Sequence, residues 1–139
     1  MKSLTNSLMT AAALLVAAGS AQAQSLKAEI PFSFKAGVSM MSPGTYQVMI
    51  NPSGTTSPMI RLYNESERKG VLLLVSWRDA AKEWVAGGVP KISFECVEGR
   101  CSLAQVWRGG RDALHVDALR HDRRTVGAVQ IITLELKAE

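Results

Sequence analysis

The sequence predicts an all-β protein, a single antiparallel β-sandwich or small barrel of about seven or eight short strands. Three observations predict this fold class. Apolar and polar residues alternate with a period of two over most of the chain, as they do in half-buried strands. The alternating stretches are short and are separated by Pro, Gly, Asn and Ser, which favour turns. The length of 139 residues allows one small core.

The first 23 residues have the order of a secretory signal peptide. Lys2 is followed by an apolar stretch from Leu8 to Ala18 and then by Ala21-Gln22-Ala23, so we expect cleavage before Gln24. The apolar stretch has 11 residues, whereas a membrane-spanning helix needs about 20. The sequence therefore predicts a signal over residues 1–23, one domain over 24–139, no stable membrane insertion after cleavage, and a periplasmic or secreted location.

The first half of the predicted domain contains four strand-like stretches. Residues 30–34 alternate, although Pro31 lacks a backbone N–H group and requires an edge position or pairing that begins after it. After the turn residues 42–45, alternation returns at 46–50 and again at 60–62. Residues 71–75 are apolar without a break, which indicates a central strand covered on both faces.

The second half is predicted from shorter signals. Residues 78–82 favour a helical turn, residues 83–86 a short strand, and residues 91–107 a hairpin. Residues 112–124 fit neither period and are predicted as a loop with a helical turn, and alternation over 128–136 predicts the last strand.

Cys96 and Cys101, the only two cysteines, favour a disulfide bond that staples the hairpin. If Glu98 and Gly99 form a two-residue turn, the two cysteines lie opposite each other on neighbouring strands with their sulfur atoms on one face. Cross-strand neighbours lie within disulfide reach, and exported proteins keep such bonds oxidised. The alternatives, a redox pair or part of a metal site, lack the spacing and the additional ligands that they require.

Five strand and turn motifs resemble a group of short exported β proteins, common in soil bacteria of the acidobacterial type, that have no assigned function. The motifs are AEIPFSF (28–34), PGTYQV (43–48), VLLLV (71–75), ISFE (92–95) and LAQVW (103–107). The resemblance implies a β fold and no catalytic residues. Members of the group often have polar or aromatic residues at the positions of Cys96 and Cys101, so the disulfide is expected to be particular to this chain.

Candidate ligands for a metal ion, or a histidine and carboxylate pair for general base catalysis, lie in the segment His115-Val-Asp117-Ala-Leu-Arg-His121. The opposing interpretation is a solvated loop, because neighbouring arginines would repel a cation. The sequence assigns no catalytic residue, cofactor or metal, and these three residues stay candidates only.

Two other groups of side chains are candidates for ligand binding. Of 16 basic residues, Lys2 lies in the predicted signal, so 15 basic and 12 acidic residues remain, a net charge of +3. Arg120, Arg123 and Arg124 could bind phosphate or carboxylate groups, although a solvated loop is the alternative. Trp84 could stack on a sugar ring, whereas Trp77 and Trp107 end apolar stretches and are predicted in the core.

Together these features predict an exported, non-enzymatic β domain that acts as a cell-envelope or extracellular binding or structural module. Its expected partner is an envelope polymer, a glycan or another exported protein, and not nucleic acid. One alternative is a carbohydrate-binding module that uses Trp84. A second is a small metal-dependent hydrolase centred on His115, Asp117 and His121.

Overall fold

The computed structural model describes residues 25–51, 57–117 and 128–139. The predicted signal, residues 1–23, lies outside this part of the chain. Within it the chain forms eleven strands and one short helix, which confirms the all-β class and exceeds the expected number of strands. The strands are β1 (Ser25–Ile30), β2 (Phe34–Ala36), β3 (Ser39–Met41), β4 (Gly44–Asn51), β5 (Met59–Asn64), β6 (Lys69–Asp79), β7 (Lys91–Val97), β8 (Arg100–Trp107), β9 (Asp112–Val116), β10 (Gln130–Glu135) and β11 (Lys137–Ala138).

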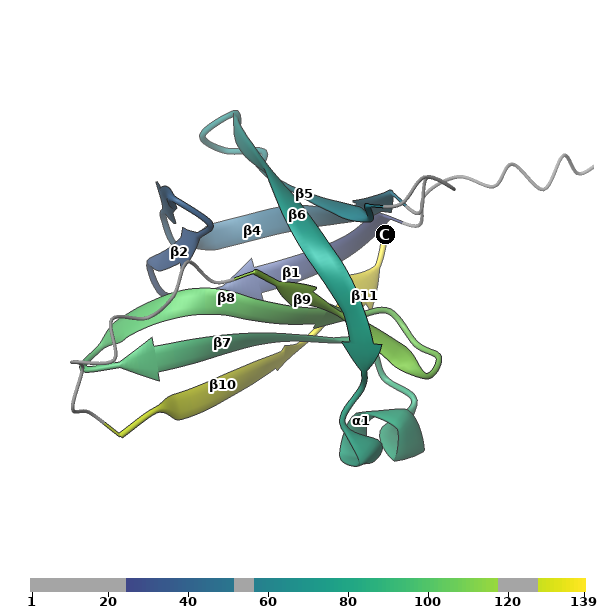
Figure 1. The fold of residues 1–139 in the computed structure, drawn as a ribbon. Helices are drawn as coiled ribbons and strands as arrows, with labels where there is room; N and C mark the ends of the chain where they lie inside the picture. Colours follow the sequence, from purple (N-terminus) through teal and green to yellow (C-terminus); the bar gives the residue numbers. More distant parts are fainter. Residues whose placement is uncertain (1–24, 52–56, 118–127) are drawn as a thin grey trace, which may run out of the picture.

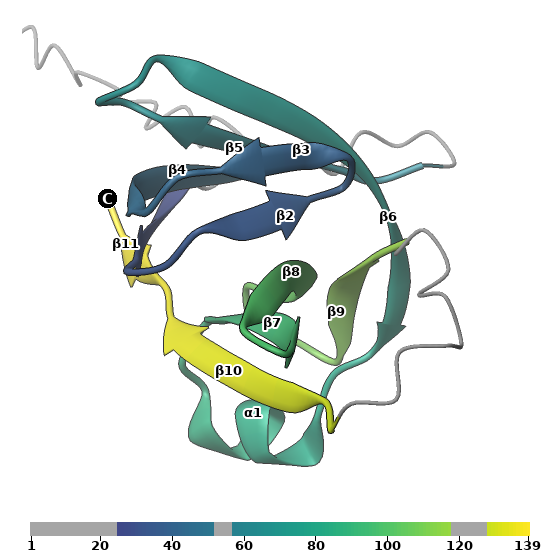
Figure 2. The ribbon, with the colours of Figure 1, turned by 90° about the vertical axis from the view of Figure 1, so that its left-hand side faces the viewer.

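The strands form one continuous sheet in the order β10-β7-β8-β9-β6-β5-β4-β1-β11. All neighbours along this path are antiparallel, while the β2–β3 hairpin joins it through a parallel pairing of β2 with β8. The long strand β6 connects the two halves of the sheet, because residues 69–74 pair with β5 and residues 75–79 pair with β9. Figures 1 and 2 show β6 running from β4 and β5 on one side to β7, β8 and β10 on the other.

The hydrogen-bonded path is open, but its two ends are adjacent in the chain. β10 and β11 are separated by Leu136 alone, so the last strands belong to opposite ends of the same sheet. The N–H group of Leu136 donates to the carbonyl oxygen of Pro90, at 2.9 Å, and this bond holds the junction beside the start of β7 (Lys91–Val97).

The buried side chains of both halves form one hydrophobic core. Phe34 on β2 joins the halves, since its ring lies 5.3 Å from that of Tyr46 on β4 and 5.2 Å from that of Phe94 on β7. Both ring pairs have the edge-to-face geometry that aromatic rings prefer. The other large, fully buried members include Ile30, Met41, Val48, Ile50, Ile60, Leu62, Ile92 and Leu114.

The predicted strand over residues 30–34 is divided at Pro31. β1 ends at Ile30 and β2 begins at Phe34, and the two strands belong to different halves of the sheet. Proline cannot donate to a sheet hydrogen bond, and in this chain it lies where the backbone passes between the halves.

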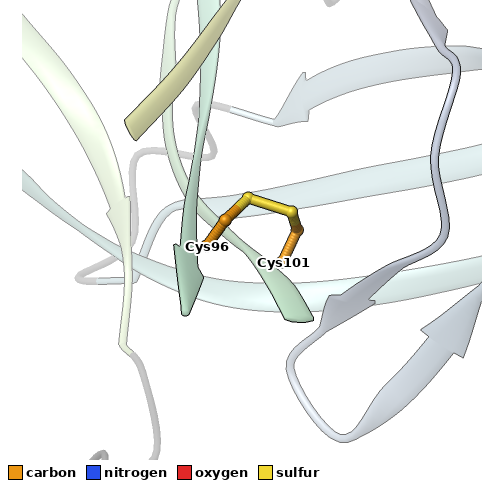
Figure 3. The surroundings of a disulfide bond; sticks show 2 residues. All are labelled: Cys96 and Cys101. Carbon is orange, nitrogen blue, oxygen red and sulfur yellow. A yellow bond between two sulfur atoms is a disulfide. The ribbon is translucent and has the colours of Figure 1, made fainter. Parts of the chain in front are cut away.

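The disulfide hairpin is as predicted (Figure 3). Cys96 is opposite Cys101 and Val97 is opposite Arg100, and the two sulfur atoms are bonded. The turn residues Glu98 and Gly99 both have positive φ, 51° and 79°, which is the backbone of the two-residue type I′ turn.

Two segments of the second half differ from the prediction. Residues 83–86 are not a strand but lie in α1 (Lys82–Gly87), a short helix. Gly88 caps its carboxyl end with a left-handed φ of 71°. The helix also begins later than the turn expected over residues 78–82. Part of the predicted loop over 112–124 is the strand β9, in which the adjacent residues Ala113 and Leu114 are both buried. Because these two neighbours are both apolar, apolar and polar residues do not alternate there. The pairing with β6 and β8 identifies the segment as a strand.

Candidate functional site

The first half of β6 has an unpaired backbone edge in the part of the chain that the structure describes. Residues 69–74 pair with β5 on one side, whereas the pairing of β6 with β9 on the opposite side begins only at Val75. An unpaired strand edge presents a row of N–H and C=O groups that another extended chain can use.

The same stretch of β6 exposes two large apolar side chains. Leu72 is 61% exposed and Leu74 is 65% exposed, whereas Leu73 between them is 5% exposed and packs in the core. The prediction that residues 71–75 are covered on both faces is therefore wrong. The inward side chains meet the core, but no second layer of described residues covers the outward ones.

The two leucines lie opposite one apolar and one charged residue of the neighbouring strand β5. Leu74 is opposite Met59 and Leu72 is opposite Arg61. The Arg61 guanidinium lies 5.3 Å from the centre of the Tyr63 ring, a cation–π arrangement that directs it along β5. We call Leu72 and Leu74, together with the unpaired edge of residues 69–74, the β6 edge.

The β6 edge lacks the features that usually prevent strand association. Lysine, proline or a bulge commonly protects an exposed edge. Lys69 is the one charged residue in this stretch, and its Nζ donates to the carbonyl oxygen of Met40 at 3.0 Å. Its ammonium group is therefore held against β3 and not over the leucines.

His115 and Asp117 line a second feature, a polar concavity of about 310 Å³ on the outer face of the other half of the sheet. The register places Ser76, His115 and Gln105 in one row across β6, β9 and β8. Further lining residues are Arg78, Glu95, Ser102, Leu103, Ala104 and Val116. Ser76 Oγ donates to Oδ1 of Asp117 at 3.4 Å.

The environment of His115 favours its neutral form. Burial lowers the pKa of the imidazole below its usual value and the Arg78 guanidinium lowers the pKa further, while the Glu95 carboxylate raises it. The Nε2 atom is buried and has no hydrogen-bond partner among the described residues. The ring is thus close enough to both a cation and a carboxylate for each to affect its pKa.

Of the three predicted metal ligands, the structure describes His115 and Asp117. His121 lies outside the described residues, as do Arg120, Arg123 and Arg124. Among residues 25–51, 57–117 and 128–139, no group of three His, Cys, Asp or Glu side chains could hold a metal ion. His115 and Asp117 share one concavity without a third ligand from this part of the chain.

The tryptophans lie in three different environments. Trp107 is buried, as predicted, and its Nε1 donates to the carbonyl oxygen of Gly110. Trp84 on α1 is half-buried, with its ring centre 6.4 Å from that of Trp107. Trp77, predicted in the core, is 42% exposed, and the Arg108 guanidinium lies 5.7 Å from its ring centre. Contact with Arg108 replaces the expected core packing.

Comparison with known proteins finds no family model, curated protein or solved structure that matches this chain. Within the described residues, no helix is long and apolar enough to cross a membrane. The resemblance to exported β proteins of soil bacteria stays a prediction.

Sequence reasoning missed the β6 edge. Five consecutive apolar residues fit a strand with two covered faces as well as a strand that exposes alternate leucines, and the difference depends on which distant segments pack on it. The nearest local signal is the apolar run Val71-Leu72-Leu73-Leu74 directly after Lys69-Gly70.

Proposed function

We propose that this chain is an exported, non-enzymatic binding module that associates with another exported protein through the β6 edge. The observation that carries the proposal is the exposure of Leu72 and Leu74 beside a backbone edge that no described strand pairs with. An extended segment of the partner would add a strand next to β6, with backbone hydrogen bonds supplying affinity and apolar side chains packing on the leucines.

The disulfide and the signal-like first 23 residues support a location outside the cytoplasm, in the periplasm or in the medium. A bond between Cys96 and Cys101 persists in an oxidising compartment. An apolar edge strand left open there also carries a risk of aggregation, and a partner strand that covers it removes this risk.

The two alternative functions receive less support from the geometry. Trp84 packs against Trp107, so part of its surface is not available to a sugar ring. His115 has a buried, unpartnered Nε2, whereas a histidine that acts as a general base needs an accessible nitrogen near its substrate.

Site-specific crosslinking in the organism that makes the protein tests the proposal. A photoreactive amino acid replaces Leu72 in one variant and Val85 in a control, since Val85 is also apolar and exposed but lies on α1. We expect one discrete adduct at position 72, identified by mass spectrometry as an exported protein, and none at position 85. Adding Leu74→Lys should reduce the adduct at least about tenfold, because a charge would be buried against the partner.

Two outcomes would contradict the proposal. One is equal adducts at positions 72 and 85 in properly folded protein. The other is an adduct at position 72 that Leu74→Lys leaves unchanged.

A further inference from the structure

The polar concavity on the outer face of the β7–β8–β9–β6 half is built from side chains of four separate segments. Arg78 comes from β6, Glu95 from β7, Ser102 and Gln105 from β8, and His115 from β9, with Asp117 directly after that strand. The antiparallel registers place them together, since His115 is opposite both Ser76 and Gln105, and Glu95 is opposite Ser102. Antiparallel pairing, with one irregularity between Ser93 and Phe94 in the β7–β8 pair, therefore holds the lining in place, as a preorganised site requires.

The concavity presents charges of both signs. Arg78 forms no salt bridge with a described residue, because the one such bridge in this part of the chain joins Lys91 and Glu135. A guanidinium that forms no salt bridge with these described residues can bind a ligand carboxylate through two parallel hydrogen bonds. Glu95 and Asp117 supply two carboxylates in the same lining.

His115 also lines the concavity, and its environment favours the neutral form of the imidazole. The Arg78 guanidinium lowers the pKa of its imidazole, and the Glu95 carboxylate raises it. Its buried Nε2 finds no partner among the described residues, and an unsatisfied buried polar atom costs about 1–3 kcal/mol. Because Nε2 is buried, the contacts that the concavity offers to a ligand come from the charged side chains of its lining and not from this nitrogen.

We propose that the concavity binds a small amphoteric ligand, of the size of an amino acid or dipeptide, that carries a carboxylate and an ammonium group. The carboxylate binds Arg78, and the ammonium group binds Asp117. The volume of about 310 Å³ is at the lower end of the range for ligand pockets, about 300–1,000 Å³, and suits a ligand of this size. The site is independent of the β6 edge, which lies on the other half of β6.

Binding of three matched probes tests the charge pattern. The probes are alanyl-alanine, its N-acetylated form without the ammonium group, and its C-terminal amide without the carboxylate. Titration by NMR to about 10 mM covers the millimolar affinity expected of so small a ligand. We expect alanyl-alanine to bind and to shift the imidazole signals of His115, assigned with His115→Gln, and each blocked form to bind at least about tenfold more weakly.

Variants assign each end of the probe to its side chain. Arg78→Gln should weaken the binding of alanyl-alanine and should abolish the difference in affinity between alanyl-alanine and its amide. Asp117→Asn should reduce the difference in affinity between alanyl-alanine and its acetylated form. Arg111→Gln is the control, because Arg111 is exposed and lies outside the lining. Near-UV circular dichroism checks that each variant is folded.

Three results would overturn the proposal: no binding of alanyl-alanine to folded wild-type protein, equal binding of all three probes, or binding that Arg78→Gln leaves at the wild-type level.

Discussion

At the scale of single residues, the buried side chain of Asn64 organises the backbone at the start of β6. Asn64 is 1% exposed, and its Oδ1 accepts hydrogen bonds from the N–H groups of Ser66 and Glu67 in the turn between β5 and β6. A Cβ atom at Gly44 would lie 3.0 Å from Nδ2 of Asn64, so glycine at that position lets the start of β4 approach the asparagine. These contacts fix where β6 begins, and thus where its unpaired edge lies.

The lowered pKa of His115 predicts a pH dependence of folding stability. Burial is the main cause and Arg78 the second, so the folded protein releases the imidazole proton more readily than the unfolded chain, whose pKa is about 6.5. The unfolded chain therefore binds more protons in the window below about pH 7, and the free energy of unfolding falls as the pH is lowered through it.

Thermal unfolding at several pH values measures this dependence. Between about pH 7.5 and 5.5 we expect the Tm of the wild type to decrease and that of His115→Gln to change less. Glu139, whose carboxyl pKa is lowered by hydrogen bonds from Ser25 and Gln47, titrates at lower pH and does not contribute in this window. A wild type and a His115→Gln variant with parallel Tm curves would refute the assignment.

At the scale of elements, the disulfide hairpin is the part that local sequence specifies most fully. The bond closes a loop of six residues, from Cys96 to Cys101, and loop-closure entropy alone gives a stabilisation of about 2 kcal/mol. Cys101 is also opposite Phe34 of β2, so the bond lies where β7, β8 and β2 meet.

Removal of the disulfide should therefore lower stability without changing the fold. We expect the double variant Cys96→Ala and Cys101→Ala to lose at least about 2 kcal/mol in urea unfolding. A reducing agent should shift the urea midpoint of the wild type toward that of the variant and should leave the variant unchanged. A wild-type midpoint that is insensitive to reduction would show that the bond adds no stability.

The contrast between the hairpin and β6 shows why only part of the fold and site could be predicted. The turn at Glu98 and Gly99 and the pairing of Cys96 with Cys101 depend on neighbouring residues, so the sequence pattern contains them. The exposure of Leu72 and Leu74 depends on the absence of a covering layer, and the concavity around His115 depends on registers among four strands. No pattern within one segment encodes either.

Helix α1 and strand β9 illustrate the same limit for secondary structure. The segment from Lys82 to Gly87 contains residues that suit helix or strand, and contact of Trp84 with Trp107 accompanies the helical form. Ala113 and Leu114 belong to a strand because β6 and β8 pair with it. Tertiary contacts decide between local alternatives of similar energy.

At the scale of the whole molecule, the two halves of the sheet share one core, and the chain passes between them at several places, of which β6 and Leu136 are two. β6 passes from one half to the other, and Leu136 connects β10 with β11. Leu136 is 4% exposed and belongs to the core cluster. Because neither half has a separate core, the halves should unfold together.

The substitution Leu136→Ala tests whether the junction stabilises both halves. We expect a loss of about 2–5 kcal/mol, the usual cost of truncating a buried leucine, whereas Ile131→Ala should change stability by less than about 0.5 kcal/mol, because Ile131 is 66% exposed. All three tryptophans, at positions 77, 84 and 107, lie in or beside the β7–β8–β9–β6 half, so their fluorescence reports on that half while far-UV circular dichroism reports on the whole sheet. The two signals should give the same urea midpoint in the wild type and in both variants. Separate midpoints in Leu136→Ala would show that the halves fold independently and that Leu136 only links them. Coincident midpoints at a lower urea concentration would show that the two halves, with Leu136 between β10 and β11, unfold as one cooperative unit.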